Sequence, residues 1–301
     1  MTDPLAEHRP LAVAVAYRML GSVADAEDVA QETLLRVHRE LSAGTELTSP
    51  RGFVTAVATR LAIDRLRREK RRREEYIGPW LPEPMLVDTT VDVAGAAELA
   101  DSLSTAFLVV LERLNPVERA VFLLRDVFDL PFAEVADVVG RSETNCRQIL
   151  VRARRHVHDD RSRFATSGAD RDALASRFFA AAQEGDVAGL VALLAEDATL
   201  TGDGGGKAMA FTEPLSGATT IARVLSAIFR RGRALGAQTE LVTLNGQTGL
   251  LGRDPDGRIV FAMTLDIAEG RVEGILSLVN PDKLAHLGPV SDLGLRGWRR
   301  D

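Results

Sequence analysis

The residues best suited to sequence-specific recognition lie in the segment 131–157, whose pattern predicts a helix-turn-helix. Gly140 permits a tight turn after a short helix with one apolar face, and Ser142 can cap the helix that follows. The helical period then places four apolar residues on the inner face of this second helix, namely Cys146, Ile149, Leu150 and Ala153. We expect Cys146 to serve in core packing rather than in redox chemistry.

The opposite face of this second helix carries polar and basic side chains that suit the edges of base pairs. Arg fits guanine and Gln or Asn fits adenine in the major groove, and recognition helices read bases near their amino ends. We therefore expect base contacts from Thr144, Arg147 and Gln148, which Asn145 flanks. Phosphate contacts suit Arg152, Arg154 and Arg155. A helical hairpin with a solvated basic face is the alternative that periodicity alone leaves open.

Two charged segments earlier in the chain could bind partners of opposite charge. The run 65–73 reads R-L-R-R-E-K-R-R-R and suits phosphates, although basic residues also favour the carboxyl end of a helix. The segment 25–32 gathers carboxylates at a helix start, where acidic residues are favoured in any case. It contains no His, so we expect neither a metal site nor metal catalysis there.

The bulk composition limits the classes of protein that fit. The 301 residues are too many for one ordinary core and suit two or three domains. The net charge of −6 argues against coating of nucleic acid by the whole chain. A single cysteine excludes an internal disulfide framework and a multi-cysteine zinc site. Since neither a membrane-length apolar stretch nor a secretory signal is evident, we expect a cytoplasmic protein.

The elements that must position these residues change in type along the chain. Apolar spacing predicts helices over about 12–20, 25–41 and 50–73, a proline-rich linker over about 78–92, and further helices to about 160. Asn115-Pro116-Val117-Glu118 is typical of a helix start. Later helices are expected at about 170–183, 187–194 and 219–231, and strands at about 198–201, 238–244, 259–267 and 271–279. The predicted fold is multi-domain, with all-α domains followed by an α+β domain.

Catalysis by the second half is not expected, because it is poor in the usual catalytic residues. His286 is the only His in that half. Asp203 and Lys207 could form a site pair, but the three glycines between them suit a tight backbone turn equally well. These glycines do not lead straight into a helix, so their likeness to a phosphate cradle is superficial.

Taken together, the segments of the first half resemble extracytoplasmic-function (ECF) sigma factors. Residues 16–22 (A-Y-R-M-L-G-S), 25–32 (D-A-E-D-V-A-Q-E) and 50–67 look like conserved region 2, and 114–154 resembles region 4, which reads the −35 element. In this family the acidic helix binds the clamp coiled coil of core RNA polymerase. The resemblance therefore implies polymerase contacts by Asp25, Glu27, Asp28, Gln31 and Glu32. It also implies contacts to the −10 element by Arg60, Asp64, Arg67, Arg68 and Arg71, and to the −35 element by Thr144, Asn145, Arg147, Gln148, Arg152 and Arg155.

The second half resembles the SnoaL-like members of the nuclear-transport-factor-2-like superfamily. Three signatures, W-L-P-E-P at 80–84, D-G-G-G-K at 203–207 and N-P-D-K-L at 280–284, look like those of the sigma-factor group that bears this extension. In that group the extension regulates the sigma domains of the same chain. The implied regulatory contacts are Trp80, Pro82, Asp203, Lys207, Asn280, Asp282 and Lys283.

The resemblance divides the chain into region 2 (1–76), a linker (77–95), region 4 (96–163), a SnoaL-like domain (168–288) and a tail (289–301). We expect a sigma factor that directs core RNA polymerase to specific promoters and is regulated in cis by the SnoaL-like domain, without a cofactor, a metal or an enzymatic activity. The expected partners are core polymerase and promoter DNA, and binding of a small ligand is left open. No membrane contact is expected.

Two other kinds of protein would share many of these features. A one-component transcription regulator with a ligand-sensing domain should bind operator DNA unaided. A cyclase or isomerase fused to DNA-binding helices should turn over a small molecule without polymerase. The acidic segment and the basic helix favour the sigma factor, since a plain repressor needs neither.

Overall fold

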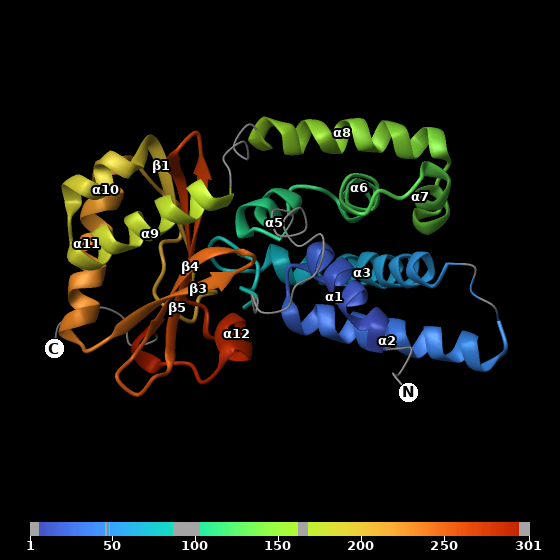
Figure 1. Ribbon diagram of the computed structural model, residues 1–301, viewed down its shortest axis with the longest axis horizontal. Helices are drawn as coiled ribbons and strands as arrows, with labels where there is room; N and C mark the ends of the chain where they lie inside the picture. Colours follow the sequence, from blue (N-terminus) through green and yellow to red (C-terminus); the bar gives the residue numbers. More distant parts are fainter. Residues whose placement is uncertain (1–5, 46, 48, 87–102, 162–167, 295–301) are drawn as a thin grey trace. The chain divides into compact units, whose positions relative to one another are not determined.

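The computed structural model describes residues 6–45, 47, 49–86, 103–161 and 168–294. It divides into two compact units, one formed by Met1–Glu75 with Val110–Asp160 and the other by Tyr76–Val109 with Arg161–Asp301. The first unit is helical and the second contains a sheet with helices (Figure 1). The predicted order of an all-α part followed by an α+β part is therefore confirmed.

Helices form the whole of the first unit's described secondary structure. They are η1 (Ala6–His8), α1 (Arg9–Leu20), α2 (Val23–Ser42), α3 (Pro50–Glu74), α6 (Pro116–Phe122), the π-helical η2 (Leu123–Val127), α7 (Phe132–Val139) and α8 (Glu143–Arg161), with α5 (Thr105–Leu111) at the boundary between the units. The predicted start of α6 is confirmed, because Asn115 and Glu118 form a reciprocal capping box. The predicted end of α1 is also confirmed, since Gly21 closes it in a left-handed conformation.

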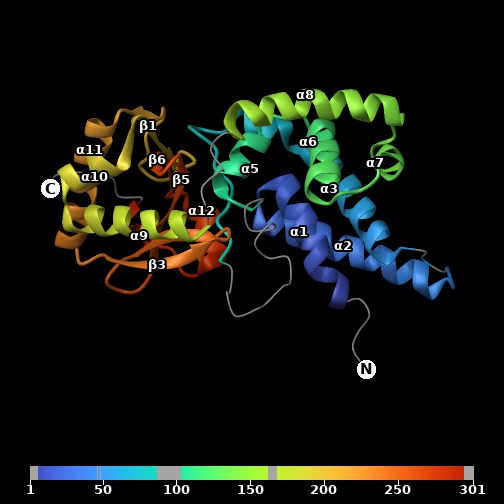
Figure 2. The same cartoon turned by 45° about the horizontal axis from the view of Figure 1, so that its top comes forward.

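Two groups of helices bury the apolar stripes of the first unit. Helices α1, α2 and α3 pack on one another, with Ala12, Ala30, Val37 and Val54 in one shared core cluster. In α8 the four predicted inner-face residues, Cys146, Ile149, Leu150 and Ala153, are all buried. Figure 2 shows α7 leading through a short turn into the long α8. The helical period in the sequence thus correctly separates the two faces of α8.

The second unit is built on one six-stranded sheet in the order β2-β1-β6-β5-β4-β3. Strands β1 and β6 run parallel, and the other neighbours are antiparallel. The strands are β1 (Leu194–Asp203), β2 (Leu215–Ser216), β3 (Gln238–Leu244), β4 (Gln247–Arg253), β5 (Ile259–Ala268) and β6 (Arg271–Leu278). The helices are α9 (Gly168–Glu184), α10 (Val187–Leu193), α11 (Ala218–Ala234) and α12 (Pro281–Leu284), with η4 (Ala285–Leu287) and η5 (Asp292–Gly294) after them.

Different elements pack against the two faces of this sheet. Helices α9, α10 and α11 share a large apolar core with one face, and Figure 1 shows α12 on the other side. Because side chains alternate along a strand, Leu250 belongs to the helix-covered core while its neighbour Leu251 packs with Leu81 and Leu284 on the opposite face. Leu81 lies in the linker, so the linker contributes to the core of the second unit.

The sheet differs from the prediction in two strands and in the boundaries. The pattern did not indicate β2, which has only two residues, or β4, whose Gly249 and Gly252 lower strand propensity. Phe261 on β5 covers Gly252 so closely that an added Cβ would lie 2.1 Å from the ring. Strand β1 begins at Leu194 rather than near residue 198, and the backbone of residues 289–291 pairs with Ile259, beyond the predicted domain end at 288.

Candidate functional site

The helix-turn-helix is closed by a glycine and a serine. Gly140 has a φ of 65°, a left-handed conformation that favours glycine, and its N–H donates to the carbonyl of Ala136 at the end of α7. Ser142 accepts a hydrogen bond from the N–H of Asn145 at 3.2 Å. The predicted turn and helix cap are therefore both present.

The outer face of α8 is open to solvent. The residues predicted to contact the −35 element are all exposed, namely Thr144, Asn145, Arg147, Gln148, Arg152 and Arg155. Arg147 is oriented by two neighbours, since it lies 2.6 Å from the carboxylate of Glu143 and its guanidinium is 4.8 Å from the ring centroid of Phe132. A pre-positioned guanidinium near the amino end of the helix suits base recognition.

Arg154 differs from the other arginines of α8. It donates two hydrogen bonds, of 2.9 and 2.7 Å, to the carboxylate of Asp126 in η2. This hydrogen bonding is the main reason that the pKa of Arg154 is raised. The paired guanidinium ties α8 to η2, so its geometry fits a positioning role better than the predicted phosphate contact.

Cys146 lies on the inner face of α8, and its side chain is fully buried. Burial is the main cause of the raised pKa of this thiol, since a buried thiolate would lose its hydration. A thiol that stays protonated reacts slowly, which agrees with a packing role.

The acidic residues of α2 fall into two groups. Asp25 faces inward and forms an ion pair with Arg65 of α3, which also binds Glu69 at 2.7 Å. Asp25 therefore joins two helices of the first unit. Asp28 and Gln31 are exposed, while Glu27 binds Arg9 at 2.5 Å and Glu32 binds Arg36 at 2.9 Å. These two exposed pairs are of the kind that contributes little to stability, so both carboxylates can exchange partners easily.

Arg60, predicted to contact the −10 element, is engaged within the first unit. Its guanidinium donates to the backbone carbonyls of Asp137 at 2.8 Å and Val138 at 3.2 Å, both in α7. The same arginine therefore links α3 to the first helix of the helix-turn-helix. We refer to these two hydrogen bonds as the Arg60 clasp.

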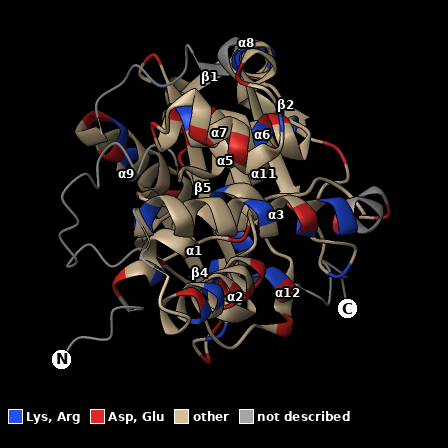
Figure 3. Ribbon diagram, turned by 90° about the vertical axis from the view of Figure 1, so that its right-hand side faces the viewer, with Lys and Arg blue, Asp and Glu red and all other residues tan. Residues whose placement is uncertain are grey.

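The other predicted −10 residues of α3 that the structure describes remain at the surface. Asp64 and Arg67 are exposed and lie 3.4 Å apart, and Arg68 donates to the backbone carbonyl of Asp64 at 3.2 Å. The side chain of Arg71 lies outside the described residues. Figure 3 shows basic segments, in blue, on both α3 and α8.

A second arginine joins the early and late helices of the first unit. Arg119 of α6 is buried and donates to the backbone carbonyl of Met19 in α1 at 2.7 Å and to Glu112 at 2.6 Å. Burial lowers the pKa of Arg119 to about 9. Together with the Arg60 clasp, this contact makes the first unit a closed arrangement of its two helical groups.

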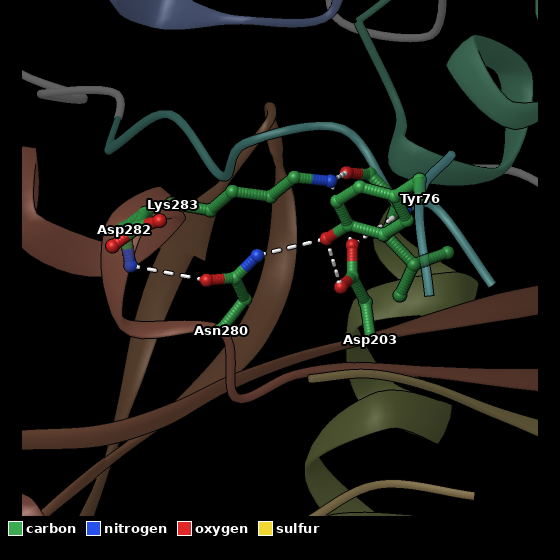
Figure 4. Close-up of polar contacts among 6 residues, drawn as sticks. Tyr76, Asp203, Asn280, Asp282 and Lys283 are labelled. Carbon is green, nitrogen blue, oxygen red and sulfur yellow. Dashed lines mark hydrogen bonds and ion pairs between the residues drawn. The ribbon is translucent and has the colours of Figure 1, made fainter. Parts of the chain in front are cut away.

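In the second unit, several of the predicted regulatory residues, from all three signatures, lie around a buried ion pair. The ammonium of Lys283 lies 2.7 Å from the carboxylate of Asp203, and the two side chains are 8% and 0% exposed. Figure 4 shows Asp203 at the end of its strand with Tyr76 and Lys283 converging on it. We call Tyr76, Asp203, Asn280 and Lys283 the linker clamp.

The linker clamp holds the backbone of the linker directly. The Asp203 carboxylate accepts the N–H of Leu81 at 2.8 Å, and Lys283 donates to the Leu81 carbonyl at 2.6 Å. The same ammonium lies 4.1 Å from the ring centroid of Trp80 and 4.7 Å from that of Tyr76. Each charge of the buried pair thus has several partners, which a buried ion pair needs in order to be tolerated.

Tyr76 links the linker to two signatures at once. Its hydroxyl donates to Asp203 at 2.5 Å and accepts from the side-chain amide of Asn280 at 2.8 Å. Burial first, and then the hydrogen bond to Asp203, raise the pKa of Tyr76 well above its usual range. The phenol is therefore a neutral donor.

The glycines of the 203–207 signature make room for the linker. An added Cβ at Gly205 would lie 2.2 Å from Asn280 and 2.9 Å from the Tyr76 hydroxyl, and one at Gly206 would lie 2.8 Å from Ile77. Both glycines also have positive φ, of 57° and 70°. The tight backbone turn, one of the two readings that the sequence left open for residues 203–207, is therefore present and has room for the linker.

Lys207 and Asp282, which the resemblance grouped with these contacts, pair with each other instead. They lie 2.5 Å apart at the surface, with side chains 56% and 62% exposed, and the described hydrogen bonds connect neither side chain to the linker. Pro82 is buried within the bound linker. The structure therefore separates a buried clamp from an exposed ion pair beside it.

Two further residues that bind the linker were not singled out in the sequence. Asn245 exchanges backbone and side-chain hydrogen bonds with Met85, at 2.8 and 2.9 Å, and donates to the carbonyl of Leu103 at 3.0 Å. His286 lies 2.7 Å from the carbonyl oxygen of Pro84. Asn245 precedes Gly246 in a typical hairpin turn, so its sequence context indicated the turn but not the linker contact.

The described ranges contain neither a cluster suited to a metal ion nor a helix suited to span a membrane. No cluster of three or more His, Cys, Asp or Glu side chains there could hold a metal ion. Likewise, none of the helices in those ranges has both the length and the apolar composition that a membrane span requires.

Comparison with known proteins gives matches over both halves. The chain matches the family model described as Sigma-70 region 2 over residues 5–72 and that described as Sigma-70, region 4 over residues 104–157. It is 38% identical over 284 residues to the ECF RNA polymerase sigma factor SigJ of Mycobacterium tuberculosis, with 90% of this chain and 89% of that protein covered. The probable ECF sigma factor SigI of the same species is 33% identical over 189 residues, covering 62% of this chain and 64% of that protein.

The similarity extends to three-dimensional structure. The crystal structure of the Mycobacterium tuberculosis ECF sigma factor SigJ matches with a TM-score of 0.75 at 33% sequence identity. The match covers 95% of this chain and 99% of that one, so it includes the α+β part.

Proposed function

The chain belongs to the family of extracytoplasmic-function RNA polymerase sigma factors, and from this premise we propose that its α+β domain regulates transcription initiation in cis by binding the linker. The observation that carries this proposal is the buried Lys283–Asp203 pair. Asp203 accepts a hydrogen bond from the Leu81 N–H, and Lys283 donates one to the Leu81 carbonyl. A buried pair with this many partners is costly to break, so the bound linker is a defined state rather than a loose association.

The residues that bind polymerase are proposed to lie on α2. Asp28 and Gln31 are exposed, and Glu27 and Glu32 have only surface partners that polymerase can replace. Asp25 is the weakest candidate of the predicted set, because its carboxylate is paired with Arg65 inside the unit. We assign to Asp25 the role of fixing α2 on α3 so that the other four residues are presented together.

Promoter recognition is proposed to use α8 for the −35 element and α3 for the −10 element. The exposed face of α8 presents Arg147 and Gln148 as base-reading residues, and Arg152 and Arg155 as phosphate contacts. On α3, Arg67 and Arg68 are available at the surface, whereas Arg60 is held by α7.

The closed first unit is proposed to open when the promoter is bound. The positions that name the −35 and −10 elements differ by about 25 base pairs, which corresponds to roughly 85 Å at 3.4 Å per base pair. Helices joined by the Arg60 clasp cannot reach both elements at once. The clasp must break, and Arg60 then becomes free for the −10 element. Because the linker joins α3 to α5 along the chain, a domain that binds it is in a position to influence this opening.

The test is promoter-dependent transcription with core RNA polymerase, with start sites mapped. The full chain should direct initiation at defined sites, and Asp28→Lys combined with Gln31→Lys should abolish it by repelling the positive partner surface expected there. Operator-type binding of DNA by the chain alone, with no polymerase-dependent initiation, would instead support a one-component regulator.

A further inference from the structure

The α+β domain contains a cavity of about 1010 Å³, open to solvent, between α11 and the helix-covered face of the sheet. Its wall includes Leu225 and Phe229 of α11 and Phe261 and Met263 of β5. The rings of Phe229 and Phe261 meet edge to face, with centroids 6.1 Å apart. Pockets for small molecules typically measure roughly 300–1,000 Å³ and are mainly apolar, so this cavity has the size and lining of a binding site.

Exposed apolar side chains gather where this cavity opens. Met209, Phe211, Leu235 and Leu293 all line it, and they are 53%, 37%, 51% and 36% exposed. Grouped apolar exposure is unfavourable in water and marks a surface that binds an apolar partner. The mouth of the cavity therefore suits a molecule with an apolar body.

The two basic residues of the cavity lie close together on α11 and favour an anion. Arg231 and Arg233 line the cavity from the last turn of α11, and Glu184 is the single acidic residue of the lining. The side-chain charge around the cavity is therefore net positive. Two guanidinium groups can bind a carboxylate by charge-assisted hydrogen bonds.

Apart from the exposed carboxylate of Glu184, the lining lacks the side chains that usually carry acid–base or nucleophilic catalysis. It contains no Asp, His, Cys, Lys or Tyr, and all of its residues belong to the described part of the chain. Ser277 is present but has no His or Asp beside it in the lining to activate its hydroxyl. The cavity is thus equipped to bind a ligand rather than to convert it.

The cavity and the linker clamp occupy opposite faces of the same two chain segments. Gly202 and Val279 line the cavity, and the next residues in each segment, Asp203 and Asn280, hold the linker. The N–H groups of Val279 and Asn280 both donate to the carbonyl of Asp203. A displacement of either wall by a ligand would therefore move the clamp.

We propose that the cavity binds an apolar organic anion, such as an aliphatic carboxylate, and that its occupancy alters how firmly the clamp holds the linker. The proposed effect of the ligand on the clamp rests on the regulatory role given above to the linker. The proposed binding of the ligand does not rest on that role, since ligand binding is measured without polymerase or DNA.

Binding is tested on the full chain with three probes that share one chain length: dodecanoate, dodecanol and dodecyltrimethylammonium, each below its micelle concentration. Titration calorimetry should show saturable binding of dodecanoate, about tenfold tighter than that of dodecanol, with the ammonium weakest. Arg231→Gln with Arg233→Gln should remove the preference for dodecanoate and leave dodecanol binding unchanged. Arg230→Gln is the matched control, because Arg230 is exposed on the same helix outside the cavity.

Substitutions at two exposed apolar residues test where the ligand binds. Phe211→Asp should weaken binding of dodecanoate and dodecanol alike, whereas Leu241→Asp, at an exposed residue outside the cavity, should not. Absence of saturable binding, equal affinity for the three head groups, or equal effects of the two Asp variants would each overturn the assignment of the site.

The coupling is tested by hydrogen exchange of the Leu81 and Met85 amides, which donate to Asp203 and Asn245. Saturating dodecanoate should change their exchange rates severalfold, and dodecyltrimethylammonium should not. Saturable binding with unchanged exchange at both amides would overturn the coupling and leave the binding site standing. Failure of polymerase-dependent transcription would affect neither result.

Discussion

The ammonium of Lys283 lies between the carboxylate of Asp203, 2.7 Å away, and the carbonyl oxygen of Leu81, 2.6 Å away. One buried side chain therefore satisfies an acidic residue of the sheet and the backbone of the linker at the same time. Release of the linker exposes this charge pair to water, so linker binding and burial of the pair are one event.

The two partners of this pair should depend on each other for their contribution to the stability of the linker-bound state. Lys283→Met leaves the Asp203 carboxylate buried without its counter-charge, and we expect a loss of about 3–5 kcal/mol. Asp203→Asn combined with Lys283→Met should cost clearly less than the sum of the single changes. The measurement is denaturant unfolding followed by Trp80 fluorescence in a Trp298→Phe background. Additive losses would show that the two residues act independently.

The Arg60 clasp should keep the first unit closed. Arg60→Ala removes two hydrogen bonds to the backbone of α7, with an expected loss of about 1–3 kcal/mol in the closed form. Dyes placed by His38→Cys on α2 and His156→Cys on α8, in a Cys146→Ser background, should show lower energy transfer in this variant.

Arg67→Ala is the control for the clasp, because exposed Arg67 pairs only with the nearby Asp64 in the described ion pairs. It should leave the transfer efficiency unchanged. Core polymerase with promoter DNA should lower the efficiency in the parent chain as well. Constant high transfer in that complex would contradict the proposed opening.

Two arginines of α8 should respond differently to substitution. Arg147→Ala should weaken use of the −35 element by about 1–3 kcal/mol on promoters with the preferred base, and little on promoters that lack it. Arg154→Ala should weaken all promoters alike and lower thermal stability, because it removes the bidentate contact to Asp126. The check is competitive transcription from a set of single-base −35 variants. The same base dependence for both variants would refute this division of roles.

Cys146 should react slowly with thiol reagents in the folded chain. Its raised pKa keeps the thiolate fraction at pH 8 below that of a free cysteine, and its burial excludes the reagent. Unfolding should therefore raise the rate of reaction at pH 8, because it exposes the thiol and removes the cause of its raised pKa. Asn145→Cys in a Cys146→Ser background provides an exposed control, and equal rates for the two cysteines would contradict the packing of α8.

The helical half could be predicted well because its signals are local. The turn at Gly140, the cap at Asn115 and the inner stripe of α8 each follow from neighbouring residues. The Arg60 clasp could not be predicted, since a guanidinium bound to backbone carbonyls 77 and 78 residues away leaves no pattern in the chain.

The α+β half shows the same division between local and distant effects. Strand β4 was missed because Gly252 lowers strand propensity locally, and its cover by Phe261 arises only in the folded sheet. The signature residues Asp203, Asn280 and Lys283 were identified by resemblance, but Tyr76 was not. Its role depends on a contact 127 residues along the chain, which its surroundings in the sequence do not indicate.

Transcription with core RNA polymerase, comparing Lys283→Met with Lys207→Met, tests the central claim most directly. Both changes remove a lysine that pairs with an aspartate, but Lys283 is buried against the linker and Lys207 is exposed beside it. If linker binding regulates initiation, Lys283→Met changes the yield from a mapped promoter severalfold, while Lys207→Met stays at the level of the parent chain. Equal yields from all three proteins, with the Lys283→Met chain still folded, would contradict regulation through the linker clamp.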